Sequence, residues 1–261
     1  MEGPCINTKY RGAQNEDSIV LPNITDFKDY ISQSNNMIKL ITLAPELHNA
    51  LATVKFLSNA GIAINLGHSD ATFDISMKSF DMGIGCVSHF LNGMRCFHQH
   101  EPSIMGAVLM HNTVYSELIC DGFHLAPSTV RILSKVLGSN RIILVTDSIL
   151  AAELEDGTYS TQSFDEPLIV NKGDTQLAYS KSRAGSTITL DKAFKNYMDF
   201  AVQSVEEAVQ CVTINPASHL GMGSSIGSIE IGKKASFTIL DINYKVSHTI
   251  INGKVAYMAS S

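Results

Sequence analysis

The 261-residue chain has little of what several classes of protein require. Lys and Arg number 19 against 25 Asp and Glu, the net charge is −6, and no basic run is present, so a nucleic-acid partner is not expected. No apolar run approaches the roughly 18 residues that span a membrane. The first residues, MEGPCINTKY, lack the pattern of a signal peptide. These absences predict a protein that acts on neither nucleic acid nor membrane.

Cysteine is also scarce, and its pattern bears on the cellular compartment. The five cysteines are odd in number and contain no CxxC pair. This usage fits a reduced, cytoplasmic environment better than a disulfide framework. We therefore expect all five to be packing residues, at Cys5, Cys86, Cys96, Cys120 and Cys211.

What the chain does have is five apolar, β-branched runs, each ending at a polar residue able to do chemistry. These residues are, in order, Glu46, His68, His89, His124 and Asp147. Helix-like segments separate most of the runs, and strands alternating with helices predict a parallel sheet covered on both faces. If that sheet curls into a barrel, all the strand ends meet at one rim, where the active sites of such barrels lie. The pattern indicates a metal and a proton carrier.

The segments between and after these runs predict further elements. Residues 50–59, 72–80 and 127–137 are expected to be helices, the last with proline in its first turn and Gly138 as its stop. After Asp147, Gly-containing turns and short apolar runs predict a β excursion at about 156–180. Ser204 and Glu207 form a potential capping box for a later helix. Asn252-Gly253 predicts a two-residue hairpin turn.

The histidines after the second and third runs are the first candidates for metal ligands. His68 follows a glycine at a strand end, and a lone histidine there is more often structural. His89 comes one β/α unit later, and neighbouring parallel strands lie about 4.8 Å apart, so the two rings could converge on one ion. The pair favours a ligand role.

The other strand-end residues leave alternatives open. An aspartate that ends a buried strand, such as Asp147, is costly unless it is paired, hydrogen-bonded or catalytic. Taken alone, it is as often a helix N-cap. In DGFH, His124 is the better candidate for touching a substrate, while Asp121 is expected to fix the turn. Glu46 could be a ligand, but a rim carboxylate bound to neighbouring backbone is the favoured interpretation.

The ordered motifs TLAPE, GHSDAT, SHFLNGM, HEP, DGFH, LVTDS, AGSTITLDKA and NPASHLG carry a resemblance to a known family. From residue 1 to about residue 255, the chain closely resembles the N-acetylglucosamine-6-phosphate deacetylases of the amidohydrolase superfamily. The resemblance implies a metal-dependent hydrolase with a (β/α)8 barrel, an α/β fold. It also implies that the metal-binding glutamate is Glu2, in MEGP, and that Glu46 is a neighbouring rim residue.

The resemblance implies roles for the individual site residues. Glu2, His68 and His89 would hold one divalent ion, zinc or iron, with a fourth position open as hydrolysis requires. The ion would activate water and polarise the acetamide carbonyl. Asp147 would take the proton of the attacking water and return it to the departing amine. His124 would orient or stabilise the carbonyl oxygen as it becomes an oxyanion.

The resemblance also implies a small-molecule partner, an amino-sugar phosphate, and a homodimer. Asn92 and Gly93 would contact the sugar phosphate, with Gly93 replacing a usual alanine. The family's phosphate-binding arginine before Glu-Pro, which acts across the dimer interface, is His100 here. Histidine is only partly charged near pH 7 and lacks the bidentate fork, so phosphate anchoring would be weakened or reassigned. Nearby alternatives are Arg11, Arg95 and His98.

The chain opens at the EGP motif, which family members reach only after a long preceding segment. We therefore expect an incomplete barrel over residues 1–219, with five full parallel strands, and remnants of a small β-sandwich over 220–261. Open sheet edges and an exposed interior are expected to drive self-association. Any second metal site that the family builds from its first strand has no ligands here.

Two classes of function stay open. The first is removal of the acetyl group from N-acetylglucosamine 6-phosphate, a step of amino-sugar catabolism that yields glucosamine 6-phosphate and acetate, or the same reaction on another N-acyl amino sugar. The second is an inactive fragment that keeps the motifs but holds neither metal nor substrate. A nucleobase- or dihydropyrimidine-type amidohydrolase is disfavoured, because those enzymes usually need a first-strand histidine pair.

Overall fold

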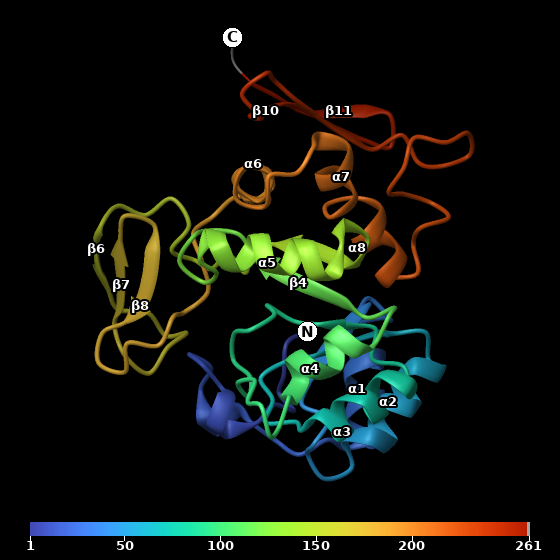
Figure 1. Cartoon of the computed structure of the whole chain (residues 1–261), viewed down its shortest axis with the longest axis vertical. Coiled ribbons are helices and arrows are strands. Elements are labelled where there is room, and N and C mark those ends of the chain that lie inside the picture. Colours follow the sequence, from blue (N-terminus) through green and yellow to red (C-terminus); the bar gives the residue numbers. More distant parts are fainter. Residues whose placement is uncertain (260–261) are drawn as a thin grey trace. The chain divides into compact units, whose positions relative to one another are not determined.

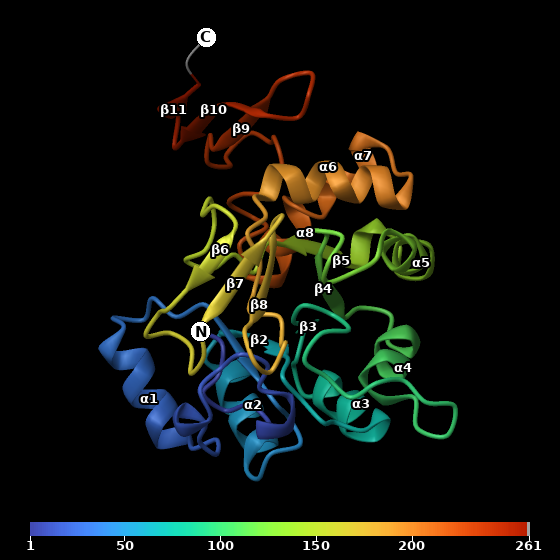
Figure 2. The same cartoon turned by 90° about the vertical axis from the view of Figure 1, so that its left-hand side faces the viewer.

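The computed structural model describes residues 1–259 (Figures 1 and 2). Its residues divide into two compact units. The first unit comprises Met1–Leu118 and Asp147–Thr187. The second comprises Ile119–Thr146 and the chain from Ile188 onward. This division runs through the part of the chain in which the sequence predicts the barrel. The predicted boundary between residues 219 and 220 stays a prediction.

The parallel strands occur in the sheet order β1-β2-β3-β4-β5, as the alternating runs predict. Consecutive residues of β1 and β2 are buried, which is the pattern of a sheet covered on both faces. Direct parallel pairing joins β1 to β2, β2 to β3 and β3 to β4. The strands are β1 (Leu40–Leu43), β2 (Ala63–Leu66), β3 (Cys86–Val87), β4 (Tyr115–Ile119) and β5 (Ile142–Val145).

The helices of the first unit begin at the residues that their local sequence favours. Asn23 and Thr72 cap α1 and α3 by accepting hydrogen bonds from the backbone N–H groups of Thr25 and Ile75. The helices predicted over 50–59 and 72–80 are confirmed as α2 and α3. The elements are α1 (Ile24–Gln33), α2 (Ala50–Asn59), α3 (Phe73–Asp81), α4 (Ser103–Met110) and the short 3₁₀ turns η1 (Thr8–Tyr10) and η2 (Glu16–Ser18).

A small antiparallel sheet also belongs to the first unit, within the range where the sequence predicts a β excursion. Its strands are β6 (Gly157–Tyr159), β7 (Leu168–Asn171) and β8 (Asp174–Leu177), with β7 in the middle (Figure 2). Alternate side chains of β7 and β8 are buried and pack with Ala151 and Ala184. The sheet therefore has its own small apolar core.

The second unit combines helices with an antiparallel sheet. Helix α5 spans Pro127–Leu137 and ends at Gly138, as predicted, and Ser204 caps α7 by accepting from the N–H of Glu207. Asn252 and Gly253 both have positive φ, as the two-residue turn between β10 and β11 requires. The other elements are η3 (Ser139–Arg141), α6 (Leu190–Ala201), α7 (Val205–Gln210), α8 (Ile214–His219), β9 (Phe237–Leu240), β10 (Val246–Ile251) and β11 (Lys254–Met258).

Among residues 1–259, no helix is both long enough and apolar enough to cross a bilayer.

Candidate metal centre and active site

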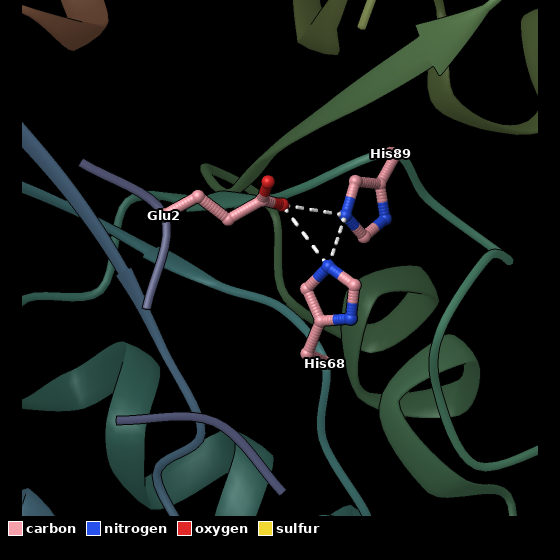
Figure 3. Close-up of side chains that lie close together, drawn as sticks. All are labelled: Glu2, His68 and His89. Atoms are coloured by element: carbon pink, nitrogen blue, oxygen red, sulfur yellow. Dashed lines mark hydrogen bonds and ion pairs between the residues drawn. The ribbon is translucent and has the colours of Figure 1, made fainter. Parts of the chain in front are cut away.

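Glu2, His68 and His89 bring one carboxylate and two imidazoles together in the first unit (Figure 3). The Oε1 atom of Glu2 lies 3.1 Å from Nε2 of His68 and 2.9 Å from Nε2 of His89. All three ligand atoms lie within 4.8 Å of one another. Zinc takes such ligands at about 2.0–2.3 Å, so side chains this close need to move little to surround one ion.

Backbone pairing at the start of the chain places Glu2. The N–H of Thr42 on β1 donates to the carbonyl of Met1, and the N–H of Gly3 donates to the carbonyl of Thr42, at 2.9 and 3.1 Å. Residues 1–3 thus run parallel to β1, and Glu2 bridges to Thr42. Since the carboxyl ends of parallel strands share one edge, Glu2 reaches the edge where His68 and His89 lie.

The two histidines leave their strands through a left-handed backbone. His68 follows β2 with φ +49°, and His89 follows β3 with φ +29°, values that residues other than glycine seldom adopt. A Cβ at Gly67 would lie 2.6 Å from a methyl carbon of Thr42 and 2.9 Å from Cβ of Ser88. The glycine of GHSD therefore lets β2 end between its neighbours, immediately before the histidine.

Backbone carbonyls fix the tautomer of both imidazoles. Nδ1 of His68 lies 2.7 Å from the carbonyl oxygen of Tyr10, and Nδ1 of His89 lies 3.2 Å from that of Asn92. A carbonyl only accepts, so each Nδ1 must carry the proton. In the neutral ring, Nε2 then carries the lone pair on the side that faces Glu2, which is the arrangement of metal-binding histidines held by outer hydrogen bonds.

The charges in this cluster are strongly coupled. Burial opposes ionisation of Glu2, but hydrogen bonding with His68 and His89, and the charge on these rings, hold the pKa of its carboxyl far below the ordinary value. Burial likewise opposes the charged form of His89, yet its bond to Glu2 raises the His89 pKa to about 9, with the charges of Asp147 and Glu117 adding to the effect. In the absence of an ion, a proton therefore supplies the positive charge that Glu2 requires.

Asp147 lies in the same unit, in the segment that follows β5. Its φ is +48°, and its carbonyl accepts the N–H of Ser186 at 2.8 Å. Its charge contributes to the raised pKa of His89, so its carboxylate acts on the metal-ligand cluster. The open alternative of a helix N-cap is wrong, because strand and turn residues follow Asp147 and the next described helix begins at Leu190.

Asp121 and His124 form a tight pair within the second unit. Oδ1 of Asp121 accepts the backbone N–H groups of Phe123 and His124, both at 2.8 Å, so it fixes the turn as expected. Its Oδ2 lies 2.6 Å from Nδ1 of His124. Burial is the largest single effect and opposes ionisation of Asp121, but the hydrogen bonds and charge of His124, together with the N–H of Phe123, outweigh it and lower the Asp121 pKa. Asp121 thus fixes the orientation of the His124 ring by bonding to its Nδ1 atom.

Glu46 is a rim carboxylate bound to its neighbours, as its favoured interpretation predicts. It accepts hydrogen bonds from the side chains of Asn7 and Ser69 and from the N–H of Asp70, at 3.0, 2.6 and 2.6 Å. These contacts join the segment before η1 to the segment after His68. They occupy both carboxylate oxygens, so Glu46 acts in holding the loops.

Comparison with known proteins agrees with this geometry. The profile of the amidohydrolase family matches residues 7–256. The chain belongs to the amidohydrolase family. The resemblance carried by the sequence motifs is therefore confirmed, and with it the predicted fold class.

Several amidohydrolase relatives are similar over nearly the whole chain. The N-acetylglucosamine-6-phosphate deacetylase of Vibrio furnissii is 31% identical over 100% of this chain and 64% of its own length. The N-acetylgalactosamine-6-phosphate deacetylase of Escherichia coli O157:H7 is 32% identical over 98% and 67%. The structure of N-acetylglucosamine-6-phosphate deacetylase from Thermotoga maritima superimposes with a TM-score of 0.91, at 35% identity over 99% of this chain and 69% of that one. The chain thus spans about two thirds of these amidohydrolases.

Asn92 and Gly93 lie close to the histidines, as loop residues after β3. The amide nitrogen of Asn92 donates to the carbonyls of His89 and Phe90, at 3.1 and 3.3 Å. Gly93 has φ +56°, and a Cβ there would lie 3.1 Å from Nδ1 of His68. Its carbonyl accepts the N–H of Ser69 at 3.1 Å. Both residues thus shape the histidine loops, and their contact with a sugar phosphate stays a prediction.

His100 lies apart from the cavity next to these loops. The cavity holds about 390 Å³ and is lined by residues that include Lys9, Arg11, Gly93 and Glu166, but not His100. His100 is exposed in a turn closed by paired backbone bonds between His98 and Glu101, and its N–H donates to Nδ1 of His98. A phosphate contact by His100 stays a prediction as well.

Two further side chains reach the histidines, and sequence reasoning missed both. Oε2 of Glu117, on β4, accepts the backbone N–H of His89 at 3.3 Å. The amide nitrogen of Gln14 lies 3.4 Å from Nε2 of His68. A carboxylate inside the half-buried strand YSELI was a usable signal for Glu117, because an unpaired charge removed from water is costly. Gln14 lies in an irregular loop, where no pattern marks it.

Proposed function

We propose that this amidohydrolase chain is a metal-dependent deacetylase of N-acetylamino-sugar 6-phosphates, with N-acetylglucosamine 6-phosphate as substrate and glucosamine 6-phosphate and acetate as products. The observation that carries the proposal is the convergence of Glu2, His68 and His89 with both imidazoles held as Nε2 ligands. The Vibrio furnissii and Thermotoga maritima relatives are both N-acetylglucosamine-6-phosphate deacetylases, which supports this substrate.

Glu2, His68 and His89 fit a divalent ion, which we take to be zinc or iron. Two nitrogens and one carboxylate oxygen form a three-ligand set that leaves a position for water. A bound ion of this kind polarises a carbonyl and lowers the pKa of water. The side chains contribute the orientation, because Tyr10 and Asn92 fix both rings before any ion arrives.

Asp147 is proposed as the proton carrier. A carboxylate near the cluster can accept a proton from the attacking water and return it to the departing amine. The left-handed backbone of Asp147 and the bond from Ser186 hold the segment that presents it. His124, fixed by Asp121, is proposed to orient the carbonyl oxygen as negative charge develops there.

Asn92, Gly93 and His100 are proposed as substrate-binding residues. Arg11, Arg95 and His98 are the alternatives to His100 for binding the phosphate. A homodimer and a cytoplasmic location complete the proposal. The dimer is checked by light scattering of the purified chain, and the location by fractionation of the source cells.

The deciding experiment measures metal content and acetate release on the same preparation. We expect about one divalent ion per chain, and acetate from N-acetylglucosamine 6-phosphate but little from the unphosphorylated sugar. Metal-loaded protein that releases no acetate from any tested N-acetylamino-sugar phosphate would overturn the proposal in favour of an inactive chain. N-Acetylgalactosamine 6-phosphate is the second candidate, because the Escherichia coli relative is 32% identical to this chain.

A further inference from the structure

A buried chain of polar side chains crosses the parallel sheet of the first unit. Oγ1 of Thr42 lies 3.0 Å from Oγ of Ser88, which accepts the amide nitrogen of Asn65 at 3.1 Å. The same amide nitrogen donates to Oε1 of Glu117 at 2.7 Å. Thr42, Asn65 and Ser88 are at most 5% exposed, and Glu117 is half-buried. This polar chain links β1, β2, the end of β3 and β4.

The polar chain ends on the backbone of a proposed metal ligand. Oε2 of Glu117 accepts the N–H of His89 at 3.3 Å, and the backbone carbonyl of Glu117 accepts the N–H of Phe90 at 2.7 Å. Two consecutive N–H groups are thus bound by one residue. They flank the position where the backbone turns left-handed, at φ +29° of His89. Such a conformation persists only where its surroundings fix it.

Fold stability alone is a weak reason for a carboxylate at this position. Even partial burial of a charge is costly, and apolar side chains of similar volume commonly stabilise a core as well or better. Leu118, the next residue of β4, is fully buried and shows that the strand accepts apolar side chains. What distinguishes Glu117 is that one oxygen is held by Asn65 and the other points at the N–H of His89.

We propose that Glu117 is a positioning residue that holds His89 in its metal-binding conformation, with Asn65, Ser88 and Thr42 holding Glu117 in turn. Outer residues that orient a ligand commonly change metal affinity by roughly 10–100-fold when they are replaced. The inference rests on the proposed function only in placing a divalent ion at Glu2, His68 and His89. It requires neither a particular substrate nor turnover.

The test titrates the metal-free full chain with Co²⁺ and follows its visible absorption, with a competing chelator to obtain affinities. Glu117→Met keeps the volume and removes both acceptors, and we expect a roughly 10–100-fold weaker affinity and an altered spectrum. Glu117→Gln can still accept the His89 N–H through its amide oxygen, so we expect a loss of roughly three- to tenfold. Leu118→Ala is the matched control, because it removes a buried side chain from the opposite face of the same strand.

Leu118→Ala should lower the unfolding temperature while leaving the Co²⁺ affinity unchanged, which separates positioning from general loosening. Either Glu117 variant that folds and binds Co²⁺ within about twofold of wild type would overturn the inference, as would an equal loss in Leu118→Ala. Acetate release is measured alongside. Weakened Co²⁺ binding in the variants, with no acetate from loaded wild type, would support the inference while overturning the proposed function. Glu117 variants with unchanged Co²⁺ affinity, together with a wild type that releases acetate, would overturn the inference and support the proposed function.

Discussion

The Nε2 atoms of His68 and His89 lie 3.1 Å apart, with the same oxygen of Glu2 about 3 Å from each. With both Nδ1 atoms protonated, the two Nε2 lone pairs face each other and need a positive charge between them. One shared proton satisfies this arrangement partly, and a divalent ion satisfies it fully. This relationship makes the cluster a candidate site for a cation and underlies the predictions on metal binding.

Removing one ligand is expected to abolish stoichiometric metal binding. His89→Ala should bind Co²⁺ or zinc more weakly by well over the roughly 10–100-fold that loss of an outer residue costs, because a first ligand is gone. Metal analysis after dialysis against a weak chelator measures the effect. His98→Ala, in an exposed turn, is the control and should retain wild-type metal content. Equal metal content in the two variants would mean that the ion binds elsewhere.

Asp147→Asn should abolish turnover while leaving the metal bound. The amide cannot accept and return the proton, but it preserves the size of the side chain. Acetate release and metal content are compared with those of Asp29→Asn, an exposed carboxylate on α1 of the same unit. Near-normal activity of Asp147→Asn would exclude the proposed proton carrier.

His124→Ala should lose roughly 10²–10³-fold in kcat, as for a lost oxyanion donor.

The strand-end pattern was sufficient to predict that His68 and His89 lie close together, because each follows an apolar run whose parallel pairing is confirmed. Glu2 could be assigned only through the family resemblance. It lies at the start of the chain, where no strand signal precedes it, and its place depends on backbone bonds to the distant Thr42. Glu117 escaped because a single charge in a strand fits ordinary alternation. Its bond to His89 arises only when β3 and β4 pair.

The metal-free protein is expected to lose stability as pH rises from about 6.5 toward 9. In the fold, the pKa of His89 is raised to about 9 from its ordinary value of 6.5, so the stabilisation is fully present below pH 6.5 and is lost as pH passes 9. The difference is on the order of 3 kcal/mol. Urea unfolding in excess chelator, at pH 6 and pH 9, measures it.

His89→Gln should remove most of this pH dependence, whereas His98→Gln should keep it. A chelated wild type whose stability over this range changes no more than that of His89→Gln would contradict the assigned coupling between His89 and Glu2. Saturating zinc should also flatten the wild-type profile, since an ion replaces the proton at the two imidazoles.

Gly185→Ala tests whether the AGSTITLDKA segment positions Asp147. Gly185 has φ +59°, and a Cβ there would lie 2.6 Å from the carbonyl oxygen of Asp147 and 2.5 Å from a methyl carbon of Ile149. The Asp147 segment must therefore shift, and we expect kcat to fall by at least tenfold with metal content unchanged, since small misplacements of a catalytic group can cost roughly 100-fold. Gly61→Ala is the matched control: its φ is +71°, in the same unit, but a Cβ there would meet nothing within 4 Å. Backbone strain is common to both variants, and the clash belongs to Gly185 alone. A kcat loss confined to Gly185→Ala identifies the contact with Asp147 as the cause, whereas equal losses in the two variants would reduce the effect to general destabilisation and remove the support that this segment gives to Asp147.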